Sequence, residues 1–161
     1  MPTLNRLIRE GAHTWNAQTI VPSITLPSHT SMLTGVEPDK HKILWNDWVP
    51  ERGMVTVPTV CALAKRQKLK TAMFVGKSKF IHLFVPKTVD EFSFPAYSAK
   101  IVARTAAEYF VAERPALTFV HFADSDGAGH EHGWGSPQQK RAFAEEDEAL
   151  SILLKAVHRS G

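Results

Sequence analysis

The stretch "ALTFVHFADSDGAGHEHGWGS", residues 116–136, decides how the chain is expected to fold. Its first eight residues are mostly apolar, which predicts a buried strand over 116–123. Around and behind the end of that run lie His121, His130 and His132 with Asp124 and Asp126, threaded through four glycines. Metal-binding residue types on a pliable backbone at the end of a strand indicate a site at the edge of a sheet.

The segments on either side alternate between helix-like and strand-like patterns. The apolar run "KTAMFVG" at 70–76 predicts a second buried strand, and 13–21 reads as extended. Helices are predicted at 3–10, 27–34, 58–68, 97–113 and from Ser136 onward. Alternation of this kind, with near-continuous apolar strands, predicts an α/β fold with a mostly parallel sheet and helices on both faces.

The last helix has the clearest start signal. Ser136 fits the N-cap, Pro137 the first turn and Gln139 the third position of a capping box. One apolar face is predicted to run along this helix to its end, formed by Phe143, Leu150, Leu154 and Val157.

Composition excludes several classes of protein. The 161 residues are 43% hydrophobic and 22% charged, with a formal net charge of +3, as in an ordinary globular domain. Cys61 is the only cysteine, so neither an internal disulfide nor a cysteine-rich zinc site can form. No apolar run approaches the roughly 20 residues that cross a bilayer. The basic residues are scattered and give nucleic-acid binding little support.

Asp126 and His130 are the first candidate metal ligands. They stand four residues apart with Gly127, Ala128 and Gly129 between them. A carboxylate with an imidazole suits zinc or another divalent transition metal better than calcium or magnesium. A solvated glycine-rich turn explains the same residues about equally well. Two ligands do not complete a zinc site; Asp124 and His132 are nearby candidates with open roles, whereas His121 is expected to pack within the strand.

A second polar motif begins a hundred residues earlier, in "VPSITLPSHTSMLTGVEPDKHKI" at 21–43. Thr25 stands at or just before the start of the short helix of small residues that ends at Gly35. Free amides and the helix dipole favour an anion there, and metal coordination could activate a hydroxyl as a nucleophile. Spacing alone favours a simpler interpretation, in which Thr25 or Ser23 is an ordinary N-cap worth about 1 kcal/mol.

Taken together, three motifs resemble the alkaline phosphatase superfamily, and most closely its type I phosphodiesterase/nucleotide pyrophosphatase family. They are "PTLNRLIREGA", "TLPSHTSMLTGVEPDKHKI" and "DGAGHEHGWGS", in the order that the family shows. The resemblance implies that Thr25 is the nucleophile and a ligand of one of two zinc ions (or other divalent transition metals). It implies that Asp126 and His130 bind the other ion.

The same resemblance implies a small-molecule phosphodiester or nucleotide substrate, with Ser28 and Asn46 as substrate-binding positions. Ser28 stands where the nucleotide-cleaving members usually carry an asparagine, and Asn46 fits a structural role as well. Three alternatives stay open. A sulfatase-like enzyme shares the frame of "TLPSH", but threonine cannot be oxidised to the sulfatase aldehyde. A phosphonate hydrolase of the superfamily fits the motifs, and so does a non-catalytic remnant of the fold.

The resemblance further implies that residues 1–161 are a partial catalytic domain, without the family's first strand and its C-terminal half. We therefore expect at most weak zinc binding and negligible turnover from this chain by itself. An open sheet edge would also favour oligomers. The compartment is not indicated, although a leader segment upstream would direct such a protein to the periplasm or outside the cell.

Overall fold

The computed structural model describes residues 1–160 and contains a three-stranded parallel sheet of strand order β2-β1-β3. The central strand β1 spans Thr71–Val75, and β3 spans Leu117–His121. Both predicted strands are therefore confirmed. The short strand β2, Glu91–Ser93, was not predicted. In the register of the sheet, Ala72 of β1 lies opposite Glu91 of β2 and Thr118 of β3.

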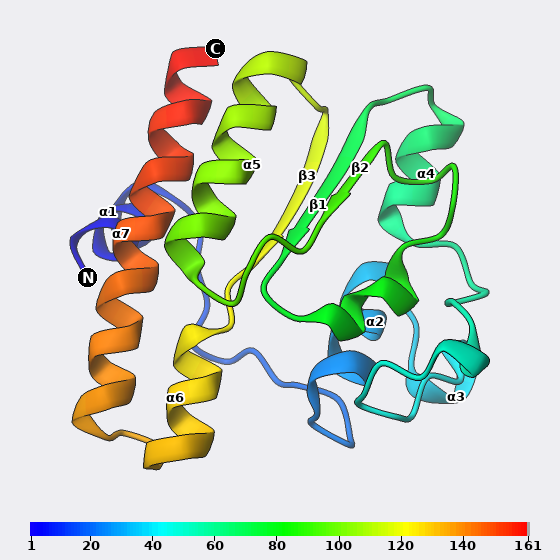
Figure 1. The fold of residues 1–161 in the computed structure, drawn as a ribbon, viewed down its shortest axis with the longest axis horizontal. Helices are drawn as coiled ribbons and strands as arrows, with labels where there is room; N and C mark the ends of the chain where they lie inside the picture. The colour runs from blue at the N-terminus through cyan, green and yellow to red at the C-terminus, as the bar shows by residue number, and fades with distance from the viewer. Residues whose placement is uncertain (161) are drawn as a thin grey trace.

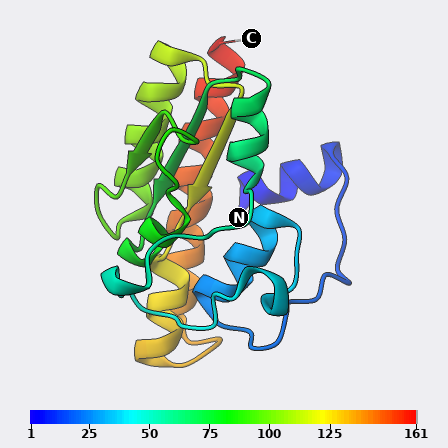
Figure 2. The ribbon, with the colours of Figure 1, turned by 90° about the vertical axis from the view of Figure 1, so that its right-hand side faces the viewer.

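Helices cover both faces of this sheet, as the sequence predicts (Figures 1 and 2). On one face lie α5, Ala99–Glu113, and α7, Pro137–Ser160. On the other lie α2, Thr25–Thr34, and α4, Val60–Arg66. The shorter elements are α1 (Pro2–Glu10), α3 (Pro38–His41), η1 (Pro50–Arg52), η2 (Ser78–Leu83) and α6 (Asp124–His132). Two expectations differ: 13–21 forms no regular element, and the predicted glycine loop is helix α6.

The alternation of side chains along β1 divides the core into two layers. Met73 and Val75 point toward α2 and α4, in a cluster with Leu26, Cys61 and Phe80. Ala72 and Phe74 point the other way, toward α5. This period of two is what a strand buried on both faces requires. It places the carboxyl ends of β1 and β3 beside α2 and α6, where the candidate residues lie.

Helix α7 packs through buried alanines, with the partly buried Ile152 and Leu153, rather than through the predicted apolar face. Ala142, Ala149 and Ala156 are buried, and Ala149 forms a cluster with Ala99 and Ala103 of α5. Phe143 and Val157 are 41% and 46% exposed. Seven-residue spacing of alanines lets two helices approach closely, which the larger side chains would prevent.

The start of α7 is confirmed only in part. The Ser136 hydroxyl accepts a hydrogen bond from the Gln139 amide at 3.1 Å, as an N-cap does. The Gln139 side chain does not return to Ser136. Its oxygen accepts from the Gly135 amide at 2.6 Å, and its nitrogen donates to the Ser125 carbonyl at 3.2 Å. Gln139 therefore ties α7 to α6.

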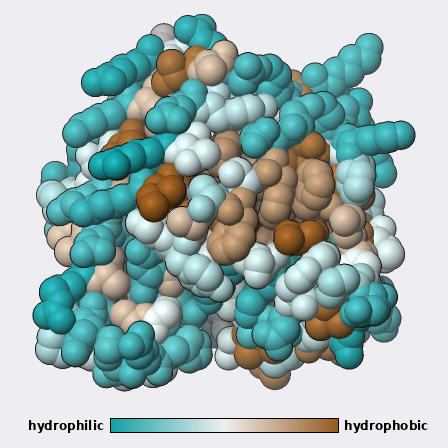
Figure 3. Space-filling view, viewed as in Figure 1, coloured by the Kyte–Doolittle hydropathy of each residue, from teal (hydrophilic) through white to brown (hydrophobic). Residues whose placement is uncertain are grey.

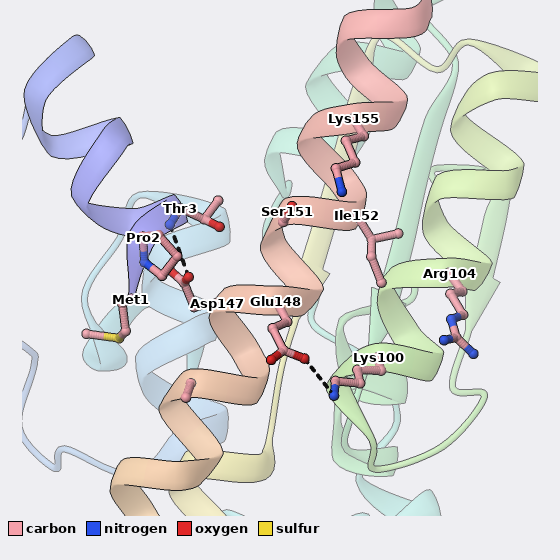
Figure 4. A pocket seen from close by; sticks show the side chains of 11 residues that line it. Met1, Pro2, Thr3, Lys100, Arg104, Asp147, Glu148, Ser151, Ile152 and Lys155 are labelled. Carbon is pink, nitrogen blue, oxygen red and sulfur yellow. Dashed lines mark hydrogen bonds and ion pairs between the residues drawn. The ribbon is translucent and has the colours of Figure 1, made fainter.

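Asp147 connects the middle of α7 to the first turn of α1 (Figure 4). Its carboxylate accepts hydrogen bonds from the amides of Thr3, at 3.0 Å, and Leu4, at 2.7 Å. Helix α1 has no side-chain cap from its own N-cap residue, so this distant aspartate supplies one. Burial raises the pKa of the Asp147 carboxyl, but these hydrogen bonds outweigh burial and lower that pKa.

Replacing Asp147 with alanine should lower the free energy of unfolding by about 1–2 kcal/mol, because two helix amides lose their acceptor. The native pKa of Asp147 is depressed, so its contribution is present above the unfolded value of about 4 and disappears as the pH falls below it. Urea titrations at pH 7 and at stepwise lower pH measure the difference. Glu148→Ala is the control, since Glu148 pairs with Lys100 at the surface. An equal effect of the two variants at pH 7 would contradict the capping role.

The surface near β2 is partly apolar. Figure 3 shows apolar side chains in the region of β2 and η2, where the rings of Phe84 and Phe92 stack with centroids 5.0 Å apart. β2 and β3 are the edges of the sheet within residues 1–160. Self-association through such an edge stays a prediction. No helix in this described part of the chain is long and apolar enough to cross a membrane.

Candidate functional site

Thr25 is the first residue of α2, two residues earlier than the helix start predicted from sequence. The helix includes Pro27 in its first turn, where a missing N–H does no harm because the first amides have no partner inside the helix. Asn46 satisfies one of these amides: its side-chain oxygen accepts a hydrogen bond from the Leu26 N–H at 3.0 Å. The structure therefore places Asn46 next to Thr25, at the positive end of α2.

Ser28 lies one turn further along α2 and points toward the segment before the helix. Its hydroxyl is 3.2 Å from that of Thr19. Both residues line a cavity of about 630 Å³ between α2 and residues 17–20. Ser28 is thus close to Thr25 in sequence, but its hydroxyl shares a hydrogen bond with the Thr19 hydroxyl.

Asp126 and His130 lie on one face of α6, one turn apart. The His130 Nε2 is 3.7 Å from the Asp126 carboxylate, and the His130 side chain is largely exposed. Lys77, directly after Gly76 at the end of β1, donates a hydrogen bond to the same Asp126 oxygen. Burial raises the pKa of the Asp126 carboxyl, but Lys77 and the histidines outweigh burial and hold that pKa below its usual range.

Two histidines join α2 to the end of β3. The His29 Nδ1 donates to the Thr25 carbonyl at 2.8 Å, and the His29 ring meets the His121 ring at a centroid distance of 5.1 Å. Phe80 packs against both rings. Burial lowers the pKa of His29, and burial with the charges of His29 and Lys77 lowers the pKa of His121 to about 3. Both rings are therefore neutral near pH 7.

These contacts join α2 to the end of β3, which leads into helix α6 with Asp126. The charge of Asp126 contributes to the pKa of His29, one turn after Thr25. His121 packs in the strand, as expected from the sequence, and its Nδ1 is buried without a hydrogen-bond partner. His29 of the first motif thus packs on His121 at the carboxyl end of β3, and α6 with the second motif follows that strand.

Asp124 and His132, whose roles the sequence leaves open, belong to other contacts. The Asp124 carboxylate accepts a hydrogen bond from the Ala99 amide at 2.9 Å and so caps α5. Burial raises the pKa of the Asp124 carboxyl despite this hydrogen bond. The His132 Nε2 lies 3.7 Å from the carboxylate of its neighbour Glu131 at the surface.

Gly129 allows α6 to pack as closely as it does. A methyl group at this position would lie 2.6 Å from the Trp134 ring and 2.7 Å from the Gln139 side-chain nitrogen. The Trp134 ring also meets the His130 ring, with centroids 5.3 Å apart. The glycine therefore brings the turn after α6 against the helix face next to His130.

The donor set of Asp126 and His130 fits half of a transition-metal site: one carboxylate oxygen and one imidazole nitrogen on a single helix face. Among residues 1–160, no three His, Cys, Asp or Glu side chains gather closely enough to hold a metal ion. A cavity of about 470 Å³ between α1, α5 and α7 is lined by none of the predicted site residues (Figure 4).

Sequence reasoning assigned no site role to three residues that the structure brings to this region: Lys77, which it noted only as a family-like loop position, His29 and His82. Lys77 follows a buried strand directly, which is the position where parallel sheets gather ligands, so its place was readable. His29 stands inside the "TLPSH" motif and could have been read from its one-turn spacing to Thr25. Nothing in the sequence around His82 indicates its contacts, because its partners lie about 30 residues away.

Comparison with known sequences identifies the family of this chain. The model of the family described as type I phosphodiesterase / nucleotide pyrophosphatase matches residues 1–161. The chain belongs to this family. The family resemblance predicted from the three motifs is thereby confirmed. No curated protein sequence matches the chain significantly.

The solved structures of similar fold include two proteins, compared here by sequence identity, TM-score and the share of each chain that is covered. Murine ectonucleotide pyrophosphatase / phosphodiesterase 5 is 18% identical with a TM-score of 0.79, over 99% of this chain and 48% of that one. An inactive variant of it, with a threonine replaced by alanine and in complex with AMP, is 17% identical with a TM-score of 0.78, over 99% of this chain and 47% of that one. Phosphonoacetate hydrolase from Sinorhizobium meliloti, in complex with phosphonoformate, is 18% identical with a TM-score of 0.68, over 97% of this chain and 48% of that one.

At these identities the likeness shows a shared fold. The chain spans about half the length of the solved structures that it matches. The observed sheet and helices therefore correspond to part of an alkaline-phosphatase-like α/β domain, as predicted. The fold is that of phosphodiesterase/pyrophosphatase-type hydrolases.

Proposed function

We propose that the protein hydrolyses phosphodiester or pyrophosphate bonds through a covalent intermediate on Thr25. One observation carries the proposal: Thr25 begins a helix whose His29 packs on His121, at the strand end that leads to Asp126. Family membership supports it. In addition, the variant of the murine relative that is described as inactive has one threonine replaced by alanine.

The reaction takes place in two steps. The Thr25 oxygen attacks phosphorus and loses its proton, a phosphorus–oxygen bond forms, and the bond to the leaving alcohol or phosphate breaks. Water then attacks the phosphothreonine, which releases the second product and restores the hydroxyl. The helix amides after Thr25 stabilise the developing negative charge. Asn46 fixes the first turn, and Ser28 extends the polar surface available to the substrate.

Asp126 and His130 would hold one divalent cation, and Thr25 would be a ligand of a second; we propose zinc for both. When bound, such ions neutralise phosphoryl oxygens and favour deprotonation of a coordinated hydroxyl. Lys77 forms an ion pair with the Asp126 carboxylate in this structure. Its ammonium therefore supplies positive charge next to the phosphoryl position and fixes the direction of that carboxylate.

The test uses the protein as its gene encodes it, with bis-p-nitrophenyl phosphate as substrate. We expect turnover that zinc restores after chelation, and acid quenching during turnover should trap a phosphoryl adduct on the peptide that contains Thr25. Turnover without such an adduct, or with the adduct on another residue, would refute the covalent mechanism. A well-folded zinc-loaded protein that cleaves no diester or pyrophosphate would refute the function.

Phosphonate hydrolysis is the second candidate, and the two lysines near Asp126 favour it. Lys77 contacts Asp126, and Lys79 is half-buried nearby, with its pKa lowered by burial and by the charge of Lys77. Two cations suit a substrate that carries a carboxylate beside its phosphonate better than they suit a diester. A higher kcat/KM for phosphonoacetate than for bis-p-nitrophenyl phosphate would select this candidate.

A further inference from the structure

His82 is a fully buried histidine whose two ring nitrogens are both occupied. Its Nε2 accepts hydrogen bonds from the Trp45 indole N–H, at 3.2 Å, and from the Val49 amide, at 3.0 Å. Its Nδ1 donates to the Gly53 carbonyl. Since Nε2 accepts, the proton of the neutral ring is on Nδ1, and the hydrogen bonds define a single tautomer.

These hydrogen bonds fasten the loop of residues 45–53 around Asn46. Trp45 precedes Asn46 directly, and Val49 follows three residues later. The rings of Trp45 and Trp48 pack on the His82 ring, with centroids 5.3 and 4.4 Å away. The loop has few other regular hydrogen bonds, because apart from η1 it forms no helix or strand. The direction of the Asn46 side chain therefore depends on the hydrogen bonds that His82 makes with Trp45 and Val49.

Asn46 in turn reaches the amide next to Thr25. Its oxygen is bound to the Leu26 N–H, in the first turn of α2. The element that carries His82 also touches the other half of the site: Lys77, the N-cap residue of η2, contacts Asp126, and Phe80 of η2 packs on His29. η2 thus spans from the Asp126 side of the site to the loop that orients Asn46.

We propose that His82 is a positioning residue for the reaction at Thr25, acting through Asn46. This inference rests on the proposed function. Its physical basis is that an ordinary loop asparagine has several rotamers, whereas a loop fixed on both sides of Asn46 holds the carboxamide oxygen on the Leu26 amide. Loss of this hold would leave Thr25 in place but loosen the turn that aims its hydroxyl.

Two substitutions at His82 and one elsewhere test the role in the protein as its gene encodes it. His82→Leu removes both ring nitrogens, whereas His82→Gln keeps an acceptor near the position of Nε2. Val102→Ala is the matched control: Val102 is fully buried, but in the core cluster on the opposite face of the sheet. It lowers stability without contact with the loop.

The first readout is the pair of NMR signals from the Leu26 amide and the Asn46 side-chain amide. We expect His82→Leu to shift both, His82→Gln to return both toward the wild-type positions, and Val102→Ala to leave them unchanged. These signals do not depend on turnover. A wild type without activity would overturn the proposed function, while the signals alone would still decide whether His82 holds Asn46.

The second readout is the separation of kcat from KM. His82→Leu should lower kcat by about 10²-fold with little change in KM, because misplacing a reacting group costs rate rather than binding. His82→Gln should recover most of kcat. Unchanged Leu26 and Asn46 signals in His82→Leu, or a kcat equal to that of Val102→Ala, would overturn the proposal. If His82→Leu does not fold, His82→Asn replaces it, since asparagine keeps a donor toward Gly53 but withdraws the acceptor.

Discussion

Replacing Thr25 with alanine should reduce kcat/KM for a phosphodiester by about 10³-fold or more, and no phosphoryl adduct should form. The physical reason is that the substitution removes the hydroxyl that we propose forms the bond to phosphorus. The fold should persist, because Thr25 makes no side-chain cap in α2, and the cap comes from Asn46. Steady-state kinetics and mass spectrometry of the quenched protein give the measurement.

Two variants control this experiment. Thr25→Ser keeps a hydroxyl and should retain measurable turnover with an adduct on the new serine. Ser23→Ala removes an exposed hydroxyl two residues before the helix and should change kcat/KM by less than about threefold. If Thr25→Ala turns over at the wild-type rate, Thr25 is not the nucleophile, and the neighbouring hydroxyls would then have to be tested.

Replacing Asp126 with asparagine should weaken zinc binding by about 10²-fold or more, because it removes the carboxylate that we propose as the anionic ligand. Stability should change less than metal affinity. The amide that replaces the carboxylate keeps an oxygen for Lys77, although the partly buried ammonium loses its counter-charge. Calorimetric zinc titration and a chelator competition measure the affinity.

Asp124→Ala is the matched control, two residues away in the same helix. Asp124 binds the Ala99 amide rather than facing His130, so its loss should cost about 1 kcal/mol of stability and leave zinc affinity unchanged. We thus expect Asp126→Asn to lower mainly the zinc affinity and Asp124→Ala to lower only the stability. If Asp124→Ala weakens zinc binding as much as Asp126→Asn does, the assignment of ligands within "DSDGAGH" is wrong.

The two long strands could be predicted because their apolar runs are nearly continuous. Thr71–Val75 is buried at every position, which is the pattern that a strand covered on both faces imposes on sequence. The strand β2 could not be predicted from the three residues Glu91–Ser93, of which only Phe92 is apolar. Pairing with β1, rather than any local preference, makes it a strand.

Helix α6 is the main error of the sequence analysis. Glycines at 127 and 129 each disfavour a helix by about 1 kcal/mol relative to alanine, so a loop was the natural prediction. Tertiary contacts override this preference. Glu146 of α7 accepts a hydrogen bond from the Ser125 amide at 2.9 Å, and Gln139 binds the Ser125 carbonyl. Helical spacing then places Asp126 and His130 on one face. In the loop interpretation, a tight turn would have had to bring these two side chains together.

The candidate site was readable where motifs are local, and hidden where contacts are long-range. Thr25, Asp126 and His130 stand in recognisable spacings, and their assigned roles stay predictions. The hold of Lys77 on Asp126 spans 49 residues, and that of Asn46 on the Leu26 amide spans 20. Such contacts depend on which strand ends meet, and this is set by the sheet order rather than by the sequence near either residue.

The hydrogen bonds between Asp147 and the first turn of α1 have a consequence for synthesis on the ribosome. The partner residue Thr3 leaves the ribosome 144 residues earlier, which corresponds to roughly 7–30 s at ordinary elongation rates. During that interval the opening helix has no acceptor for its leading amides and exposes its apolar side. Helix α1 is therefore expected to dock only after Asp147 has emerged, and a protease should cut α1 on nascent chains until then.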